Sequence, residues 1–227
     1  MNNTIIELRN VNKIYKTKVE EIHILKDVNL SFGKGDFVSI QGKSGSGKTT
    51  LLNILGLLDT PTDGEMRIDG KTVNYKNEKI KNTIRNEKIG FVFQFHYLLN
   101  EFTALENVMI PALINKQRDK KEIREKAQEL LGLVGLEERM THKPLELSGG
   151  EKQRVAIARS MINNPEIILA DEPTGNLDTE TSSVINGLFK KINEEKEQSI
   201  IIVTHSTELA NLAKYKYKIE KGKFNTV

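Results

Sequence analysis

The sequence predicts an α/β protein built on a mainly parallel sheet, and two observations carry that prediction. Four short runs consist almost entirely of apolar residues, as is typical of strands that are buried on both faces of a parallel sheet. A glycine-rich loop follows the first run and precedes a segment with helical spacing, which gives the order strand, loop, helix. The four runs span residues 37–40, 91–93, 167–170 and 200–203.

The composition bounds the class of protein. The chain has 227 residues, enough for one large or two small domains with a buried core. Its 34 basic and 31 acidic residues give a net charge of +3, too even to indicate a nucleic-acid partner. It has no cysteine, which excludes disulfides and thiol metal sites. Neither a signal peptide at residues 1–7 nor an apolar run of roughly 18 residues is present, so we expect a soluble cytosolic chain that reaches a membrane only through a partner.

Three further segments complete the predicted elements. Residues 4–40 alternate short apolar runs with turn residues and predict a strand-rich region. Residues 64–70 place Glu-Met-Arg-Ile-Asp between two glycines and predict a hairpin-like strand. Residues 119–134 predict a helix, and the lysine-rich tail after Leu212 predicts an edge hairpin. The apolar face of the predicted helix consists of Ile123, Ala127, Leu130, Leu131 and Val134.

Residues 42–49, Gly-Lys-Ser-Gly-Ser-Gly-Lys-Thr, match the phosphate-loop pattern G-x-x-x-x-G-K-[ST] at every fixed position. Glycines allow successive backbone N–H groups to turn inward and form an anion site, because a Cβ resists the φ values needed. Lys48 would add a positive charge for the β- and γ-phosphates, and the Thr49 hydroxyl can ligate Mg²⁺. A glycine-rich hinge is the alternative, but the strand before the loop and the helix expected over residues 50–58 favour phosphate binding. The predicted apolar face of that helix consists of Leu51, Leu52, Leu55 and Leu58.

Polar side chains follow the other three apolar runs. They include Gln94, the pair Asp171-Glu172, and His205. Because ligands bind at the carboxyl ends of strands in such sheets, we expect these groups to converge on the phosphates. Asp171 is then placed for Mg²⁺, and Glu172 can accept a proton from an attacking water or orient it. A carboxylate pair can also cap a helix, which Pro173 disfavours, and a lone histidine at a strand end is more often a core residue.

Residues 147–154, Leu-Ser-Gly-Gly-Glu-Lys-Gln-Arg, form a second glycine-rich turn before a helix. Ser148 and the glycines would expose N–H groups at the helix N-terminus, which again suits a phosphate. One nucleotide rarely needs two such termini. We therefore expect this loop to close over a nucleotide held by another copy of the chain. The apolar face of the helix consists of Val155, Ala158 and Ile162.

Taken in order, these motifs resemble those of an ABC-type nucleotide-binding domain over essentially the full chain. The motifs that carry the resemblance are Walker A at 42–49, the Q-loop at Gln94, the signature at 147–153, Walker B with the catalytic glutamate at 171–172, the D-loop at 176–178, the switch histidine at His205 and the adenine-stacking aromatic at Tyr15.

The resemblance implies ATP and Mg²⁺ as the bound groups, and a role for each matching residue. The residues placed around ATP are Tyr15, Gly42, Lys43, Ser44, Gly45, Ser46, Gly47, Lys48, Thr49, Thr50, Gln94, Ser148, Gly149, Gly150, Glu151 and Asp178. Those placed at Mg²⁺ are Thr49, Gln94 and Asp171. The catalytic residues would be Lys48, Glu172 and His205.

The family fold is a P-loop NTPase (RecA-like) core with a mainly parallel sheet, an antiparallel β subdomain and an inserted helical subdomain. The resemblance therefore implies one nucleotide-binding domain over residues 1–227. The ATP-binding core with its β subdomain would occupy 1–94 and 155–227, and the helical subdomain with the signature would occupy 95–154.

The resemblance also implies partners and a location. Two copies would bind head to tail, with two ATP molecules between the Walker A loop of one and the signature of the other. Integral membrane permease subunits would dock near residues 94–108, which places the chain peripherally at the cytoplasmic face of the inner membrane; no nucleic-acid partner is implied. Phe95, Tyr97 and Phe102 are candidates for that contact, or else core aromatics of the helical subdomain.

Segments 90–108 and 171–178 are similar to the lipoprotein-releasing (Lol-type) ATPases, with Lys43 departing from the proline or alanine often found there. The function implied is an ATP-hydrolysing subunit that drives lipoprotein release from the cytoplasmic membrane. The alternatives are a MacB-type macrolide or peptide efflux ATPase and a division-type ATPase that signals through a permease-like partner without transport. A soluble DNA-repair or translation ATPase is disfavoured, because such chains usually insert a long coiled coil or fuse two ATPase domains.

Overall fold

The computed structural model describes residues 4–17, 19–115 and 117–226. Within them, one sheet has six strands in the order β10-β9-β3-β8-β7-β6. All neighbouring pairs are parallel except β9 with β10, so the predicted α/β class with a mainly parallel sheet is confirmed. The four apolar runs form adjacent strands of this sheet. The strands are β3 (Phe37–Gln41), β6 (Ile89–Phe93), β7 (Ile167–Asp171), β8 (Ser199–Val203), β9 (Tyr215–Glu220) and β10 (Lys223–Thr226).

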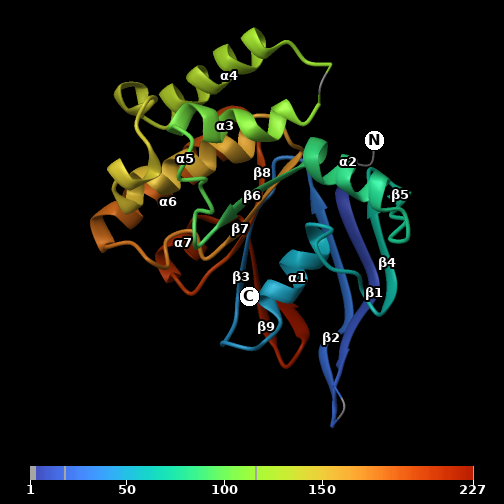
Figure 1. The fold of residues 1–227 in the computed structure, drawn as a ribbon. Coiled ribbons are helices and arrows are strands. Elements are labelled where there is room, and N and C mark those ends of the chain that lie inside the picture. The colour runs from blue at the N-terminus through green and yellow to red at the C-terminus, as the bar shows by residue number, and fades with distance from the viewer. Residues whose placement is uncertain (1–3, 18, 116, 227) are drawn as a thin grey trace.

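A second, antiparallel sheet has the strand order β2-β1-β4-β5. Helix α1 (Lys48–Leu55) lies between the two sheets (Figure 1). Apolar side chains of α1 and of both sheets form one hydrophobic core, which fixes the loop before α1 relative to the strands. The strands of this sheet are β1 (Thr4–Lys16), β2 (Glu21–Gly33), β4 (Asp63–Ile68) and β5 (Lys71–Thr72).

Helices gather on the other face of the parallel sheet, where they form a second hydrophobic core (Figure 1). None of the helices that the structure describes is long and apolar enough to span a bilayer. The elements here are α3 (Ala104–Leu113), α4 (Lys120–Leu133), α5 (Gly149–Met161), α6 (Thr179–Lys196), α7 (Thr207–Leu212) and the 3₁₀ turns η1 (Glu137–Arg139) and η2 (Pro144–Glu146). Helix α2 (Glu78–Lys88) lies beside β4 and β5 (Figure 1).

The local predictions were mostly confirmed. The helix expected over 119–134 is α4, with Asp119 as its N-cap, and the tail forms the edge hairpin of β9 and β10. The helix expected over 50–58 was wrong at both ends, because it begins at Lys48 and ends at Leu55. The backbone turns at Gly56, and Leu57 adopts a left-handed φ of 56°. Leu58 therefore leaves the apolar face and is 48% exposed.

Candidate functional site

A cavity of about 300 Å³ lies at the carboxyl ends of the parallel strands. Its walls come from the loop after β3, from Gln94 after β6, from the end of β7 and from the turn after β8. All lining residues except Ile24 were expected from the sequence. The lining consists of Ile24, Ser44, Gly45, Gly47, Lys48, Thr49, Thr50, Gln94, Asp171, Glu172 and His205.

The loop before α1 leaves the helix N-terminus free for an anion. Its N-cap residue, Gly47, has a φ of 108° and makes no side-chain capping bond. A Cβ at Gly47 would lie 3.0–3.1 Å from side-chain and backbone atoms of Leu25 and Ile24, so the loop packs tightly against β2. Uncapped N–H groups and the positive end of the helix dipole make this terminus suited to a phosphate.

The ammonium group of Lys48 is held inside the loop. Its Nζ donates to the carbonyl oxygens of Gly42 at 2.7 Å and Lys43 at 3.1 Å, and the residue is buried. Gly42, Lys43 and Ser46 do not line the cavity. Because an ammonium has three donors, Lys48 keeps one for a ligand oxygen while two fix its position.

Asp171 brings a half-buried carboxylate next to the Thr49 hydroxyl. Burial raises its pKa above the ordinary value, and the Glu172 charge adds to that, while the hydrogen bond from Thr49 and the Lys48 charge oppose it. No three His, Asp or Glu side chains in the described chain gather into an all-protein metal cage. One hydroxyl and one carboxylate beside a phosphate site nevertheless fit Mg²⁺, which usually keeps several waters and shares substrate phosphates.

Glu172 and His205 form the opposite wall. Glu172 has a left-handed φ of 46°, a conformation that costs a non-glycine residue on the order of 1 kcal/mol. Its Oε2 accepts the backbone N–H of His205 at 3.0 Å. Its Oε1 lies 3.2 Å from His205 Nε2 without hydrogen-bond alignment, so among the described atoms Oε1 remains a buried acceptor with no aligned donor. This carboxylate is therefore oriented through one oxygen and available through the other.

Two residues at the site were not expected from the sequence. Asn176 accepts a hydrogen bond from Gln94 Nε2 at 3.0 Å and donates back to the Gln94 carbonyl at 3.5 Å. The sequence signal for Asn176 is the D-loop match at 176–178, but of these residues only Asp178 was expected at the ATP site. Ile24 gives no signal, because an apolar residue in a strand is ordinary until the tertiary structure places it beside the phosphate loop.

Tyr15 lies just outside the cavity lining. Its hydroxyl donates to Asp59 Oδ2 at 2.9 Å, and Lys13 Nζ lies 4.9 Å from its ring centroid. Burial raises the pKa of Tyr15, and the bond to Asp59 adds to the increase, whereas the Thr50 hydroxyl opposes it. The Lys13 ammonium lies over the ring, and Tyr15 is 40% exposed.

The signature loop, residues 147–153, forms a separate cluster at the start of α5. Ser148, Gly149, Gly150 and Glu151 do not line the cavity, and neither does Asp178. A Cβ at Gly150 would lie 2.3 Å from Thr181, a residue of α6, which Asp178 caps. The phosphate loop and the signature loop therefore lie at two separate places on one chain.

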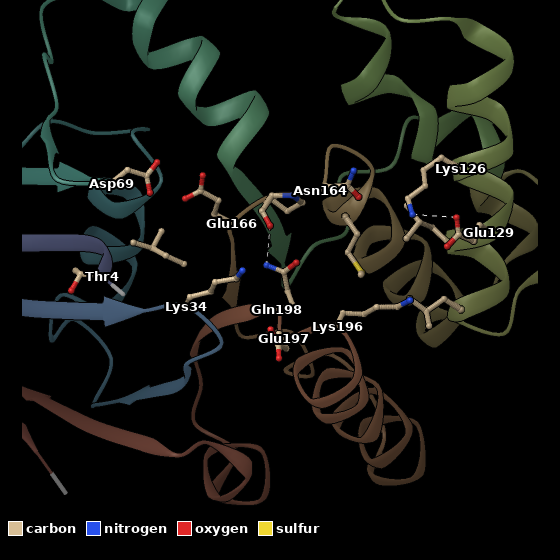
Figure 2. A pocket seen from close by; sticks show the side chains of 15 residues that line it. Thr4, Lys34, Asp69, Lys126, Glu129, Asn164, Glu166, Lys196, Glu197 and Gln198 are labelled. Atoms are coloured by element: carbon tan, nitrogen blue, oxygen red, sulfur yellow. Dashed lines mark hydrogen bonds and ion pairs between the residues drawn. The ribbon is translucent and has the colours of Figure 1, made fainter. Parts of the chain in front are cut away.

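A larger groove, of about 830 Å³, lies away from both sites, near the amino ends of β7 and β8 (Figure 2). It mixes lysine and acidic side chains, among them the ion pair of Lys126 with Glu129 at 3.2 Å. It shares no residue with the cavity of the phosphate loop. Size alone therefore does not mark the site in this molecule.

Comparisons with known proteins agree with this geometry. The family model described as "ABC transporter" matches residues 25–175. The chain is 50% identical to the lipoprotein-releasing system ATP-binding protein LolD of Aquifex aeolicus, over 96% of this chain and 95% of that protein. It is 48% identical to LolD 1 of Chlorobium chlorochromatii, over 98% of this chain and 91% of that protein.

Solved structures give the same result. A dimeric structure of the ATP-binding cassette MJ0796, in a post-hydrolysis state bound to ADP and Pi, has a TM-score of 0.88 and 44% identity, with 98% of each chain covered. A second dimeric structure of MJ0796, described as a bacterial ABC transporter cassette, has a TM-score of 0.88 and 47% identity, again with 98% of each chain covered. This chain is therefore an ATPase that belongs to the ABC transporter family.

Proposed function

We propose that this chain powers lipoprotein release from the cytoplasmic membrane as the ATP-hydrolysing subunit of a transporter. The observation that carries the proposal is the 48–50% identity to LolD proteins over almost the full chain, together with the phosphate loop, carboxylates and histidine lining one cavity. The same relatives favour lipoprotein release over the MacB-type and division-type alternatives.

At the phosphate loop, the N-terminus of α1 and Lys48 bind the β- and γ-phosphates. Thr49, Asp171 and Gln94 would hold Mg²⁺, which would supply positive charge against the negative charge that develops during transfer. The half-buried Asp171 carboxylate gains from a nearby cation, because a positive charge stabilises its ionised form and offsets the effect of partial burial on its pKa. Tyr15 stacks on the adenine.

Glu172 orients the attacking water and accepts its proton. Its Oε2 is fixed by the His205 backbone N–H, which leaves the buried Oε1 for the water. His205 lies beside that oxygen and contacts the γ-phosphate. Because the barrier to phosphoryl transfer is lowered mainly by positioning and charge stabilisation, this arrangement suits hydrolysis.

A second copy of the chain completes each site. The signature loop and Asp178 lie outside the cavity in one chain, so a head-to-tail partner places its signature loop, with Ser148, Gly149, Gly150 and Glu151, opposite the γ-phosphate. The subdomain boundaries expected from the sequence are part of this proposal. The core is 1–94 with 155–227, and the helical subdomain at 95–154 swings the signature toward the partner.

Membrane permease subunits dock on the segment after Gln94 and hold the chain at the cytoplasmic face of the inner membrane. Three large aromatic side chains of that segment are exposed: Phe95 by 63%, Tyr97 by 65% and Phe102 by 41%. Neighbouring apolar side chains exposed in this way are typical of a protein interface. The even charge balance fits a docking role rather than nucleic-acid binding.

The variant Glu172→Gln tests the proposal. Without a proton acceptor, turnover should fall at least about 100-fold while ATP binding persists, and ATP-bound dimers should accumulate. Light scattering with ATP measures the dimer, and phosphate release measures turnover. Normal hydrolysis by the variant, or monomers only, would contradict the proposal. Release of a lipoprotein from vesicles that contain the permease then tests the substrate.

A further inference from the structure

We propose that Arg139 is a positioning residue that neutralises Glu151 and so makes the signature loop acceptable to a phosphate held by a second copy of this chain. This inference rests on the proposed dimer. The loop otherwise places a carboxylate in the first turn of the helix that must receive the phosphate, and a phosphate and a carboxylate repel each other.

Glu151 is bound on both of its oxygens. Oε2 accepts the backbone N–H of Ser148 at 2.8 Å, while Oε1 lies 3.2 Å from Arg139 Nε. The Ser148 hydroxyl accepts the Glu151 backbone N–H at 3.2 Å, which completes a capping box. The Ser148 backbone bond is the largest cause that lowers the pKa of Glu151, and Arg139 lowers it further. At neutral pH this residue is therefore a carboxylate.

The capping box explains the fold of the loop but not its charge. It uses the carboxylate to satisfy one backbone donor, and it places a full negative charge against the partial positive charge of the α5 N-terminus. That charge reduces the attraction of the terminus for a phosphate. A guanidinium bound to the free side of the carboxylate restores it, because the pair together is neutral.

Two contacts orient the half-exposed side chain of Arg139. Its Nη1 lies 3.1 Å from His142 Nε2, so the guanidinium contacts both a histidine and Glu151. The segment around it is tied to α3, since the carbonyl oxygens of His142 and Met140 accept the backbone N–H groups of Ala104 at 2.8 Å and Leu105 at 3.0 Å. Arg139 therefore reaches the signature loop from a turn whose flanking backbone is hydrogen-bonded to α3.

The test places Arg139→Gln in two backgrounds that both carry Glu172→Gln, one with Glu151 and one with Glu151→Gln. Light scattering gives the ATP concentration at half-maximal dimer. With Glu151 present, Arg139→Gln should raise that concentration about tenfold, because the carboxylate charge is then uncompensated. In the Glu151→Gln background, which lacks that charge, Arg139→Gln should shift the ATP concentration at half-maximal dimer less than about twofold.

The matched control is Lys126→Gln. Lys126 on α4 pairs with Glu129 at 3.2 Å, the separation of the Arg139–Glu151 pair, so the control breaks an ion pair of equal length with the same change in charge. It should leave ATP-dependent dimerisation unchanged. Thermal unfolding of each variant shows whether the fold is retained.

Equal shifts by Arg139→Gln in both backgrounds would overturn the inference, since Arg139 would then act on the phosphate itself or only on the fold. No shift in the Glu151 background would also overturn it. If Glu172→Gln alone stays monomeric with ATP, the proposed function fails first and the inference fails with it. If that variant dimerises normally and Arg139 has no effect, only the inference fails.

Discussion

Two helices of this molecule begin at a glycine-rich loop, and their N-termini are built in opposite ways. The α1 terminus has Gly47 as N-cap, no side-chain capping bond and the buried Lys48 as its first residue. The α5 terminus has Ser148 as N-cap and a complete capping box with Glu151. Helix α1 is packed between two sheets and its N-cap Gly47 is buried, whereas Ser148 and Gly149 are exposed on the surface.

The difference shows which terminus can bind a phosphate alone. At α1 the backbone donors are uncapped, and an ammonium adds a positive charge, so one chain supplies a complete anion site. At α5 the chain uses its own side chains on two backbone donors, those of Ser148 and Glu151, and adds a carboxylate. The α5 terminus can therefore assist a phosphate that another element already holds, but it is poorly suited to capture one.

The largest expected effect comes from Lys48→Ala. This change should abolish ATP binding by the isolated chain and lower turnover at least about 100-fold, because Lys48 is the only lysine or arginine among the cavity-lining residues. Ser148→Ala should leave ATP binding by the monomer unchanged and should lower only the turnover. Titration with a fluorescent nucleotide and phosphate release separate the two results.

Lys34→Ala is the control, since Lys34 lines the distant groove of Figure 2. It should change neither measurement. Loss of monomer binding in Ser148→Ala would remove the distinction between the two termini, because the α5 terminus would then take part in capture.

A smaller effect is expected for Gly150→Ala, which tests how the α5 terminus is held. The new Cβ would lie 2.3 Å from Thr181 Cγ2, and the rotamer of Thr181 is fixed because its hydroxyl donates to Asp178 at 2.7 Å. The clash should lower the free energy of unfolding by about 1–2 kcal/mol, although alanine is otherwise favoured in a helix. Urea unfolding measures the loss.

The double variant Gly150→Ala/Thr181→Ser is the matched control, because serine lacks the methyl group and keeps the hydroxyl. It should recover most of the lost stability. An equal loss in both variants would mean that contact with α6 does not constrain the signature loop.

The comparison also shows what the sequence could predict. Apolar runs 37–40, 91–93, 167–170 and 200–203 were sufficient for the parallel sheet, because burial on both faces leaves a local signature in composition. The glycine patterns predicted both termini. The end of α1 at Leu55 was not predicted, because Leu58 keeps the helical spacing while the backbone has already turned.

The site was predictable where a motif is contiguous and not where it depends on tertiary contact. Six residues of 44–50, all except Ser46, line one cavity with the strand-end residues, because parallel strands end at the same edge of the sheet. Ile24 comes from the other sheet, and Asn176 meets Gln94 across 82 residues. The Arg139–Glu151 pair joins a 3₁₀ turn to a helix start, and no spacing rule predicts that contact.

The smallest expected effect is a pH dependence of opposite sign at the two regions. The pKa of Glu151 is lowered, chiefly by its bond to the Ser148 backbone, so its contribution to stability is present above the ordinary pKa of about 4.5 and is lost as pH falls through the lowered value. The pKa of Asp171 is raised, chiefly by burial, so ionisation of Asp171 reduces stability as pH rises through the raised value. The free energy of unfolding in urea, measured without nucleotide, tests both signs. Glu151→Gln should lose more stability relative to wild type at pH 7 than at pH 3. Asp171→Asn should gain stability relative to wild type as pH rises from 3 to 7. Equal slopes for both variants would show that the carboxylates at the two termini are not in opposite environments.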